Sequence, residues 1–225
     1  MNDLIWPRSK GPDRVLAIRS DAFQNDDKDD LAGTRIQWLK AMGRIFEREL
    51  KGILKGDEDM LARVTKTCTP EEKNAYSKIR EHPFLVIRGA GSLGMDLVAI
   101  RWKISFPIEV KSSASDVLRF SRSEKLILQA EQMIRDCTRV GLVPMYAFRL
   151  KGKRGDAWRV FALTVEDGDQ CFAGLQRLVY HRLPKVTPSK EGNFIMRWNE
   201  GMQLSSFIAY LSFLSDNESS SPSSS

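Results

Sequence analysis

The sequence predicts an α/β fold in which a mixed central sheet is flanked by helices. The first observation is an amphipathic helical pattern early in the chain, and the second is a change to short β-branched and aromatic runs after residue 83. The third is a helical pattern between the third and fourth of these runs, which would return the chain to the sheet. The predicted core order is therefore helix, three strands, helix, strand.

The first helix is expected at residues 34–54, with Thr34 as its N-cap. A second helix is expected at 70–80, because Thr69 followed by Pro70 resembles a capped start with proline in the first turn. The polar stretch 55–69 between them has no clear pattern. Apolar residues recur at steps of three and four along the first helix: Ile36, Leu39, Met42, Phe46, Leu50 and Ile53.

Four short runs are read as the strands of the core. The helix between the third and the fourth is expected at 123–139, where Leu126, Ala130, Met133 and Cys137 follow a helical period. The strands are expected at 84–87, 97–100, 106–110 and 143–148, with further strands at 159–164 and 194–198 and a closing helix at 204–214.

Composition shifts divide the chain into four parts. A polar arm is expected at 1–33, with 15–18 as its one candidate strand, because it has an acidic run and no sustained period. The core domain is expected at 34–165, with a helical insertion at 55–81, and an extension packed on this core at 166–214. The Ser-rich end, 215–225, is expected to be disordered.

Charge and residue usage restrict the function. The net charge of +6 and the pI of about 9.3 favour a polyanionic partner. The sequence contains only two histidines, which lack zinc-site spacing, so hydrolytic chemistry would depend on carboxylates and lysine. No apolar stretch approaches the roughly 20 residues of a membrane span. Three distant cysteines and the lack of a secretory signal pattern predict a reduced, cytoplasmic protein.

Asp96, Glu109 and Lys111 form the pattern that best fits catalysis. Residues two apart in a strand share a face, so Glu109 and Lys111 point the same way. A short hairpin would bring Asp96, at the start of the preceding strand, beside Glu109. Two carboxylates can hold Mg²⁺, and a lysine can orient a water or offset charge in the transition state of phosphate hydrolysis. The competing interpretation is a solvated strand face, which is common in antiparallel sheets.

A glycine pattern in the same region also fits a dinucleotide-binding loop. Gly89, Gly91 and Gly94 satisfy GxGxxG after a predicted strand. That loop must open a helix, whereas the residues that follow are typical of a strand. No nucleotide cofactor is therefore expected.

Several stretches of the chain form an ordered set of motifs. They are Gly43-Arg44-Ile45-Phe46-Glu47-Arg48-Glu49-Leu50, Val86-Ile87-Arg88-Gly89-Ala90-Gly91-Ser92, Asp96-Leu97-Val98-Ala99, Ile108-Glu109-Val110-Lys111-Ser112 and Gln129-Ala130-Glu131, with Gly141 and Pro144. Together they resemble the archaeal Holliday junction resolvases of the PD-(D/E)xK nuclease superfamily. The resemblance covers residues 43–54 and 84–149 and implies a restriction-endonuclease-like core.

The resemblance implies a Mg²⁺- or Mn²⁺-dependent homodimer that cuts opposing strands of a four-way DNA junction, in a cytoplasmic, nucleoid-associated setting. Glu47, on the first helix, matches the family's helical acid, and Glu49 on its other flank is the rival candidate. The insertion at 55–81 departs from the family pattern. The full implied site comprises catalytic Glu47, Ser92, Asp96, Glu109 and Lys111; metal ligands Glu47, Asp96, Glu109 and the Val110 carbonyl; and DNA-binding Arg44, Arg48, Arg88 and Lys125.

Two other functions remain open. One is another PD-(D/E)xK nuclease, of a restriction or repair kind, that acts on other DNA. The other is a non-catalytic DNA-binding protein with a nuclease-like fold, which would bind DNA in a salt-sensitive way without cutting it.

Overall fold

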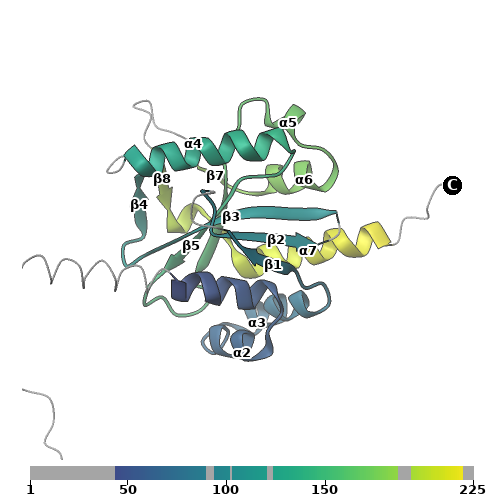
Figure 1. The fold of residues 1–225 in the computed structure, drawn as a ribbon. Helices are drawn as coiled ribbons and strands as arrows, with labels where there is room; N and C mark the ends of the chain where they lie inside the picture. The colour runs from purple at the N-terminus through teal and green to yellow at the C-terminus, as the bar shows by residue number, and fades with distance from the viewer. Residues whose placement is uncertain (1–43, 90–93, 102, 121–123, 187–193, 220–225) are drawn as a thin grey trace, which may run out of the picture. The chain divides into compact units, whose positions relative to one another are not determined.

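A mixed sheet runs through the described chain, and helices lie on both of its faces (Figure 1). The computed structural model describes residues 44–89, 94–101, 103–120, 124–186 and 194–219. All of them belong to one compact unit, Leu39–Ser225. The predicted fold class, α/β with a mixed central sheet flanked by helices, is confirmed.

Five strands of this sheet overlap predicted runs, whereas the two-residue strands β7 and β9 were not predicted. Their order is β1-β2-β3-β5-β6-β7, and β9 also pairs with β6. β3 is parallel to β5 and β6 to β7, whereas the other pairs are antiparallel. Parallel neighbours need a crossover connection. The chain passes from β3 to β5 through the predicted helix, α4 (Glu124–Arg139). The bounds are β1 Leu85–Arg88, β2 Leu97–Arg101, β3 Ile104–Ser113, β5 Met145–Leu150, β6 Trp158–Leu163, β7 Lys185–Val186 and β9 Met202–Gln203.

Alternation along β3 separates a buried apolar face from a polar one. Phe106 and Ile108 join a hydrophobic cluster that the sheet shares with the helix at 44–54, α3 (Pro70–Ser77) and α7 (Leu204–Ser219). Glu109 and Lys111 point to the opposite face, where Glu109 stands opposite Tyr146 of β5. Tyr146 belongs to a second cluster, which α4 covers. The face that carries the polar pair is thus roofed by α4.

The stretch 55–81 consists of α2 (Glu58–Val64), α3 (Pro70–Ser77) and the 3₁₀ turn η1 (Lys78–Arg80). The cap of α3 is the predicted one: Thr69 Oγ1 accepts from the Glu72 amide at 3.2 Å, and Glu72 Oε2 accepts from the Thr69 amide at 2.9 Å.

Asp156, just before β6, joins three distant segments. Its carboxylate is buried and accepts hydrogen bonds from the Tyr76 hydroxyl at 2.8 Å, the Trp158 amide at 3.1 Å and the Ser205 amide at 2.8 Å. Tyr76 lies in α3 and Ser205 in α7. The insertion and the C-terminal helix are therefore fastened to the same point of the sheet.

The region after β6 adds short helices and a small second sheet. β4, a three-residue strand that the sequence analysis missed, pairs antiparallel with β8. The strand predicted at 194–198 is β8 followed by a 3₁₀ turn. The bounds are β4 Val117–Arg119, α5 Gly168–Cys171, α6 Gly174–Arg182, β8 Ile195–Arg197, η3 Trp198–Glu200 and α7 Leu204–Ser219.

The prediction of disorder from residue 215 is wrong in part, because α7 continues to Ser219. Leu211 and Leu214 are buried in the core, and the Ser215 hydroxyl bonds back to the Leu211 carbonyl at 3.0 Å. Packing of the helix therefore outweighs the weak helix propensity of serine. The predicted arm at 1–33, the residues 34–43 of the first helix and the tail 220–225 lie outside the described residues.

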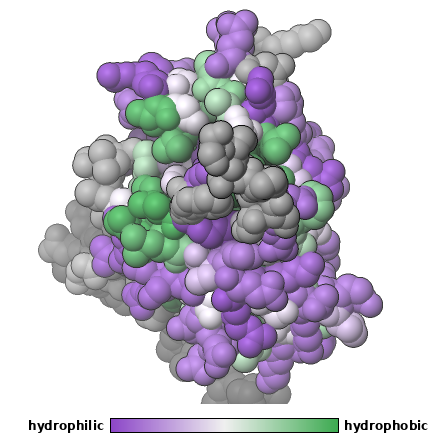
Figure 2. Space-filling model, turned by 90° about the vertical axis from the view of Figure 1, so that its right-hand side faces the viewer, coloured by the Kyte–Doolittle hydropathy of each residue, from purple (hydrophilic) through white to green (hydrophobic). Residues whose placement is uncertain are grey.

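Within the part of the chain that the structure describes, no helix is long and apolar enough to cross a membrane. One side of the molecule carries apolar residues mainly in its upper half, above a hydrophilic lower half (Figure 2).

Candidate active site

Two neighbouring hairpins hold Asp96 beside β3. Its amide donates to the Ile108 carbonyl at 3.1 Å, and its own carbonyl accepts from the Gly89 amide at 2.8 Å. The Asp96 carboxylate accepts from the Val110 amide at 2.9 Å. Because Val110 follows Glu109 directly, the hairpin places the two carboxylates on adjacent strands, as the spacing predicts.

Glu109 is a buried carboxylate with one engaged oxygen atom and one unengaged oxygen atom. Its residue is 4% exposed. Oε1 accepts from Lys111 Nζ at 2.7 Å and from Gln129 Nε2 at 2.9 Å. Oε2 is buried and has no hydrogen-bond partner among the described residues. A buried acceptor without a partner costs free energy, so this atom is suited to receive a ligand.

Burial raises the pKa of Glu109 to about 7. The positive charge of Lys111 and the hydrogen bonds of Lys111 and Gln129 oppose this rise, whereas the nearby Asp96 adds to it. Desolvation thus outweighs the lysine, and a second positive charge at this position would stabilise the ionised carboxylate.

Lys111 completes the group on the polar face of β3. Its ammonium pairs with Glu109, lies 3.5 Å from Gln129 Oε1 and is 5.9 Å from the centre of the Tyr146 ring. The side chain is 16% exposed, so the lysine is held in place and still open to solvent.

Gln129 is the site residue that the sequence prediction did not include. It projects from α4 and bonds to Glu109 at 2.9 Å and to the Gly94 carbonyl at 3.4 Å. Gly94 has φ +67°, a conformation that favours glycine. Gln129 therefore links α4 to β3 and to the loop before Asp96. Its one sequence signal is its place in the Gln129-Ala130-Glu131 stretch of the family resemblance, since a glutamine on a helix is usually exposed.

The structure separates the two candidate helical acids. Glu47 forms an ion pair with Arg88 of β1 at 2.5 Å. Glu49 is buried and accepts from Arg149 Nε at 2.9 Å and Trp158 Nε1 at 2.8 Å, so it is committed to the core. Within the described residues, no three carboxylate, histidine or cysteine side chains form a group that could hold a metal. Glu47 thus stays outside the Asp96–Glu109 pair.

Of the other predicted residues, all but Ser92 belong to the described part of the chain. Val110 is at the centre through its amide bond to Asp96. Arg44 and Arg48 are exposed on the helix at 44–54, and Lys125 is exposed on α4, one turn before Gln129. Arg88 is held by Glu47. Ser92 lies outside the described residues.

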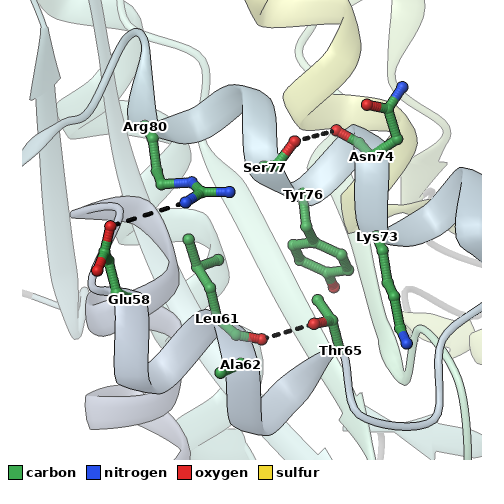
Figure 3. Close-up of a pocket in the computed structure, with 9 residues that line it drawn as sticks. All are labelled: Glu58, Leu61, Ala62, Thr65, Lys73, Asn74, Tyr76, Ser77 and Arg80. Carbon is green, nitrogen blue, oxygen red and sulfur yellow. Dashed lines mark hydrogen bonds and ion pairs between the residues drawn. The ribbon is translucent and has the colours of Figure 1, made fainter.

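A pocket of about 510 Å³ between α2 and α3 is separate from these groups (Figure 3). Arg80 and Glu58 form an ion pair at 3.7 Å beside it, and Thr65 Oγ1 donates to the Leu61 carbonyl at 2.8 Å. None of its lining residues belongs to the carboxylate site.

No protein-family model matches the chain, and no curated protein matches it. Among solved structures, the chain is similar to Hjc, a Holliday junction resolvase of the archaeal hyperthermophile Archaeoglobus fulgidus. The two are 20% identical, and the match covers 65% of this chain and 95% of that one, with a TM-score of 0.38.

Proposed function

We propose that this protein is a metal-dependent DNA endonuclease with a restriction-endonuclease-like core, and that it hydrolyses phosphodiester bonds in four-way junctions. The observation that carries the proposal is the set of Asp96, just before β2, with Glu109 and Lys111 on β3, where Oε2 of Glu109 has no hydrogen-bond partner among the described residues. A merely solvated strand pair would not bury its glutamate at 4% exposure.

The donor set fits a hard divalent cation, Mg²⁺ or Mn²⁺. Asp96 and Glu109 would hold it, with the Val110 carbonyl as a further oxygen donor. When bound, the ion supplies Lewis-acid chemistry that polarises a phosphoryl oxygen and makes a water more acidic.

The side chains of the chain supply the remaining roles. Lys111 offsets negative charge that gathers on the phosphate and orients the attacking water. Gln129 fixes the Glu109 carboxylate, so that Oε2 keeps one orientation. Arg88, positioned by Glu47, and the exposed Arg44, Arg48 and Lys125 grip the DNA backbone. Glu47 joins the metal site only if its ion pair with Arg88 opens when DNA binds.

The proposed substrate is a four-way junction, and the proposed assembly is a homodimer, since two symmetric cuts suit two identical sites. The test is cleavage of a labelled immobile junction and a matched linear duplex with Mg²⁺, by wild type, Asp96→Asn and Lys111→Ala. Paired incisions in the junction alone, lost in both variants, are expected.

Three results would contradict parts of this proposal. Cutting of both DNAs would keep the nuclease and remove junction selectivity, in favour of a restriction- or repair-like enzyme. Near wild-type cutting by either variant would refute the site. DNA binding without cutting under Mg²⁺ or Mn²⁺ would favour a non-catalytic DNA-binding protein.

A further inference from the structure

The turn between β5 and β6 lies at the same end of the sheet as the carboxylate site. β5 runs parallel to β3 with Lys111 opposite Phe148, and the Lys151 amide donates to the Ser113 carbonyl at 2.8 Å. The turn begins there, past the end of β3. Because β5 ends at Leu150, Lys153 and Arg154 lie beyond the Lys111–Phe148 pair, on the side of the sheet where β3 ends.

The backbone of this turn is fixed. Gly152 and Gly155 have φ of +74° and +76°, values that L side chains rarely adopt, so both positions favour glycine. The Gly155 amide donates to Thr67 Oγ1 at 2.9 Å, and Asp156 follows with its buried hydrogen bonds. The cations of the turn are thus presented from a rigid frame.

The turn is strongly basic, and its charges have few local partners. Lys153 and Arg154 are exposed, and in the described part of the chain neither is paired with a carboxylate. Lys153 Nζ lies 5.3 Å from the centre of the Trp198 ring, and the Arg159 guanidinium lies 3.6 Å from that centre. Arg159 is only 8% exposed and donates to the carbonyls of Asp156 and Trp158. A buried cation bonded to neutral carbonyls favours an added anion.

These cations line a pocket of about 330 Å³, together with Thr69 and Gln203. Two carboxylates also line it, but both are engaged. Both Asp156 oxygens accept hydrogen bonds, and Glu72 Oε2 accepts from the Thr69 amide. Three cations, Lys153, Arg154 and Arg159, thus face two carboxylates, which leaves the lining of the pocket with a net positive charge.

We infer that the β5–β6 turn and this pocket bind a phosphate group of the DNA strand that enters the carboxylate site. The inference rests on the proposed function for the identity of the ligand. The turn then contacts the DNA backbone at a phosphate away from the scissile bond. It would hold the strand in register, while base pairs and junction shape are read elsewhere.

The test compares two double variants that remove the same charge. Lys153→Ala/Arg154→Ala removes the two exposed cations of the turn, whereas Arg177→Ala/Arg182→Ala removes two exposed cations from α6. That helix lies at the other end of β3, where Gln176 bonds to the Ser105 carbonyl at 2.8 Å. Binding of a fluorescent four-way junction is measured without divalent metal, from about 50 to 200 mM salt.

The turn variant is expected to weaken binding about tenfold and to reduce the slope of log affinity against log salt by about 0.9, the value for one lost phosphate contact. The α6 variant should keep the wild-type slope. Swapping the cations in Lys153→Arg/Arg154→Lys should restore the slope, because the charge is retained. Equal melting temperatures show that each variant folds.

An unchanged slope in the turn variant, or an equal reduction in both variants, would overturn this inference. Cleavage assays on the same samples separate it from the proposed function. A wild type that cuts DNA while the turn variant keeps its slope would retain the nuclease and reject the turn. A wild type that never cuts, with a reduced slope in the turn variant, would reject the nuclease and retain the turn.

Discussion

Glu109 and Tyr146 stand opposite each other on β3 and β5, and each buries an oxygen atom that has no hydrogen-bond partner among the described residues. The tyrosine ring packs against Phe120 in the second hydrophobic cluster, with ring centres 5.4 Å apart. Burial, with Glu109 and Asp96 nearby, raises the pKa of the Tyr146 hydroxyl, so it stays neutral. Two unsatisfied oxygen atoms on one sheet face are a cost that the metal-free protein carries.

Tyr146→Phe should therefore leave the stability of the metal-free protein unchanged or raise it by about 1 kcal/mol. Tyr76→Phe is the matched control, because its hydroxyl donates to Asp156 at 2.8 Å, and it should cost about 1–3 kcal/mol. Urea denaturation in a chelating buffer measures both. A loss in Tyr146→Phe as large as in the control would mean that its hydroxyl has a partner.

Glu49→Gln should mainly lower stability, whereas Glu47→Gln should mainly impair cleavage. Glu49 is buried between Arg149 and Trp158, so its neutralisation should lower the free energy of unfolding by about 2–4 kcal/mol. Glu47 is 15% exposed but pairs with an arginine that is 45% exposed, so its neutralisation should cost about 1 kcal/mol, less than for Glu49, and still impair cleavage. Denaturation and junction cleavage, measured on the same preparations, separate the two. Normal cleavage by Glu47→Gln would show that neither Glu47 nor its ion pair with Arg88 is needed for cleavage.

Gln129→Ala should slow cleavage by about tenfold or more while junction binding is retained, because it releases both Glu109 and the loop at Gly94. Gln132→Ala is the control on the same helix, since Gln132 is exposed and bonds only to Asp136 and Arg135. Single-turnover cleavage of prebound junction is the measurement. Equal rates for the two variants would remove Gln129 from the site.

Cys137 should make the fold less stable at alkaline pH. Burial, with a smaller effect of Asp136, raises the pKa of its thiol from 9.0 to about 12. The unfolded chain therefore loses this proton first, and the stabilisation, complete below pH 9, is lost as pH rises toward 12. Between pH 9 and 10 the loss should be about 1 kcal/mol, because half of the unfolded thiols are already ionised at pH 9. Denaturation of wild type and Cys137→Ala at pH 8, 9 and 10 checks this, and parallel pH slopes would contradict it.

The central site residues could be predicted because strand geometry is local. Alternation places Glu109 and Lys111 on one face, and a short hairpin brings Asp96 to them, whatever surrounds the sheet. Gln129 could not be found in this way, because its position depends on how α4 crosses and rotates over the sheet. The choice between Glu47 and Glu49 likewise depends on tertiary packing, since the helical pattern places both beside the apolar stripe.

The hydrogen bonds of Asp156 to distant segments have a consequence for the order of folding during synthesis. Its partners lie 80 residues earlier in the chain and 49 residues later, at Tyr76 and Ser205. A ribosome therefore releases every residue of the carboxylate site, through Gln129, well before the segment that secures β6 has been made. A nascent chain can therefore contain all residues of the carboxylate site before it contains α7, which helps to fix β6 in the sheet. The proposed nuclease activity is therefore expected only after α7 has been synthesised and has packed against the sheet.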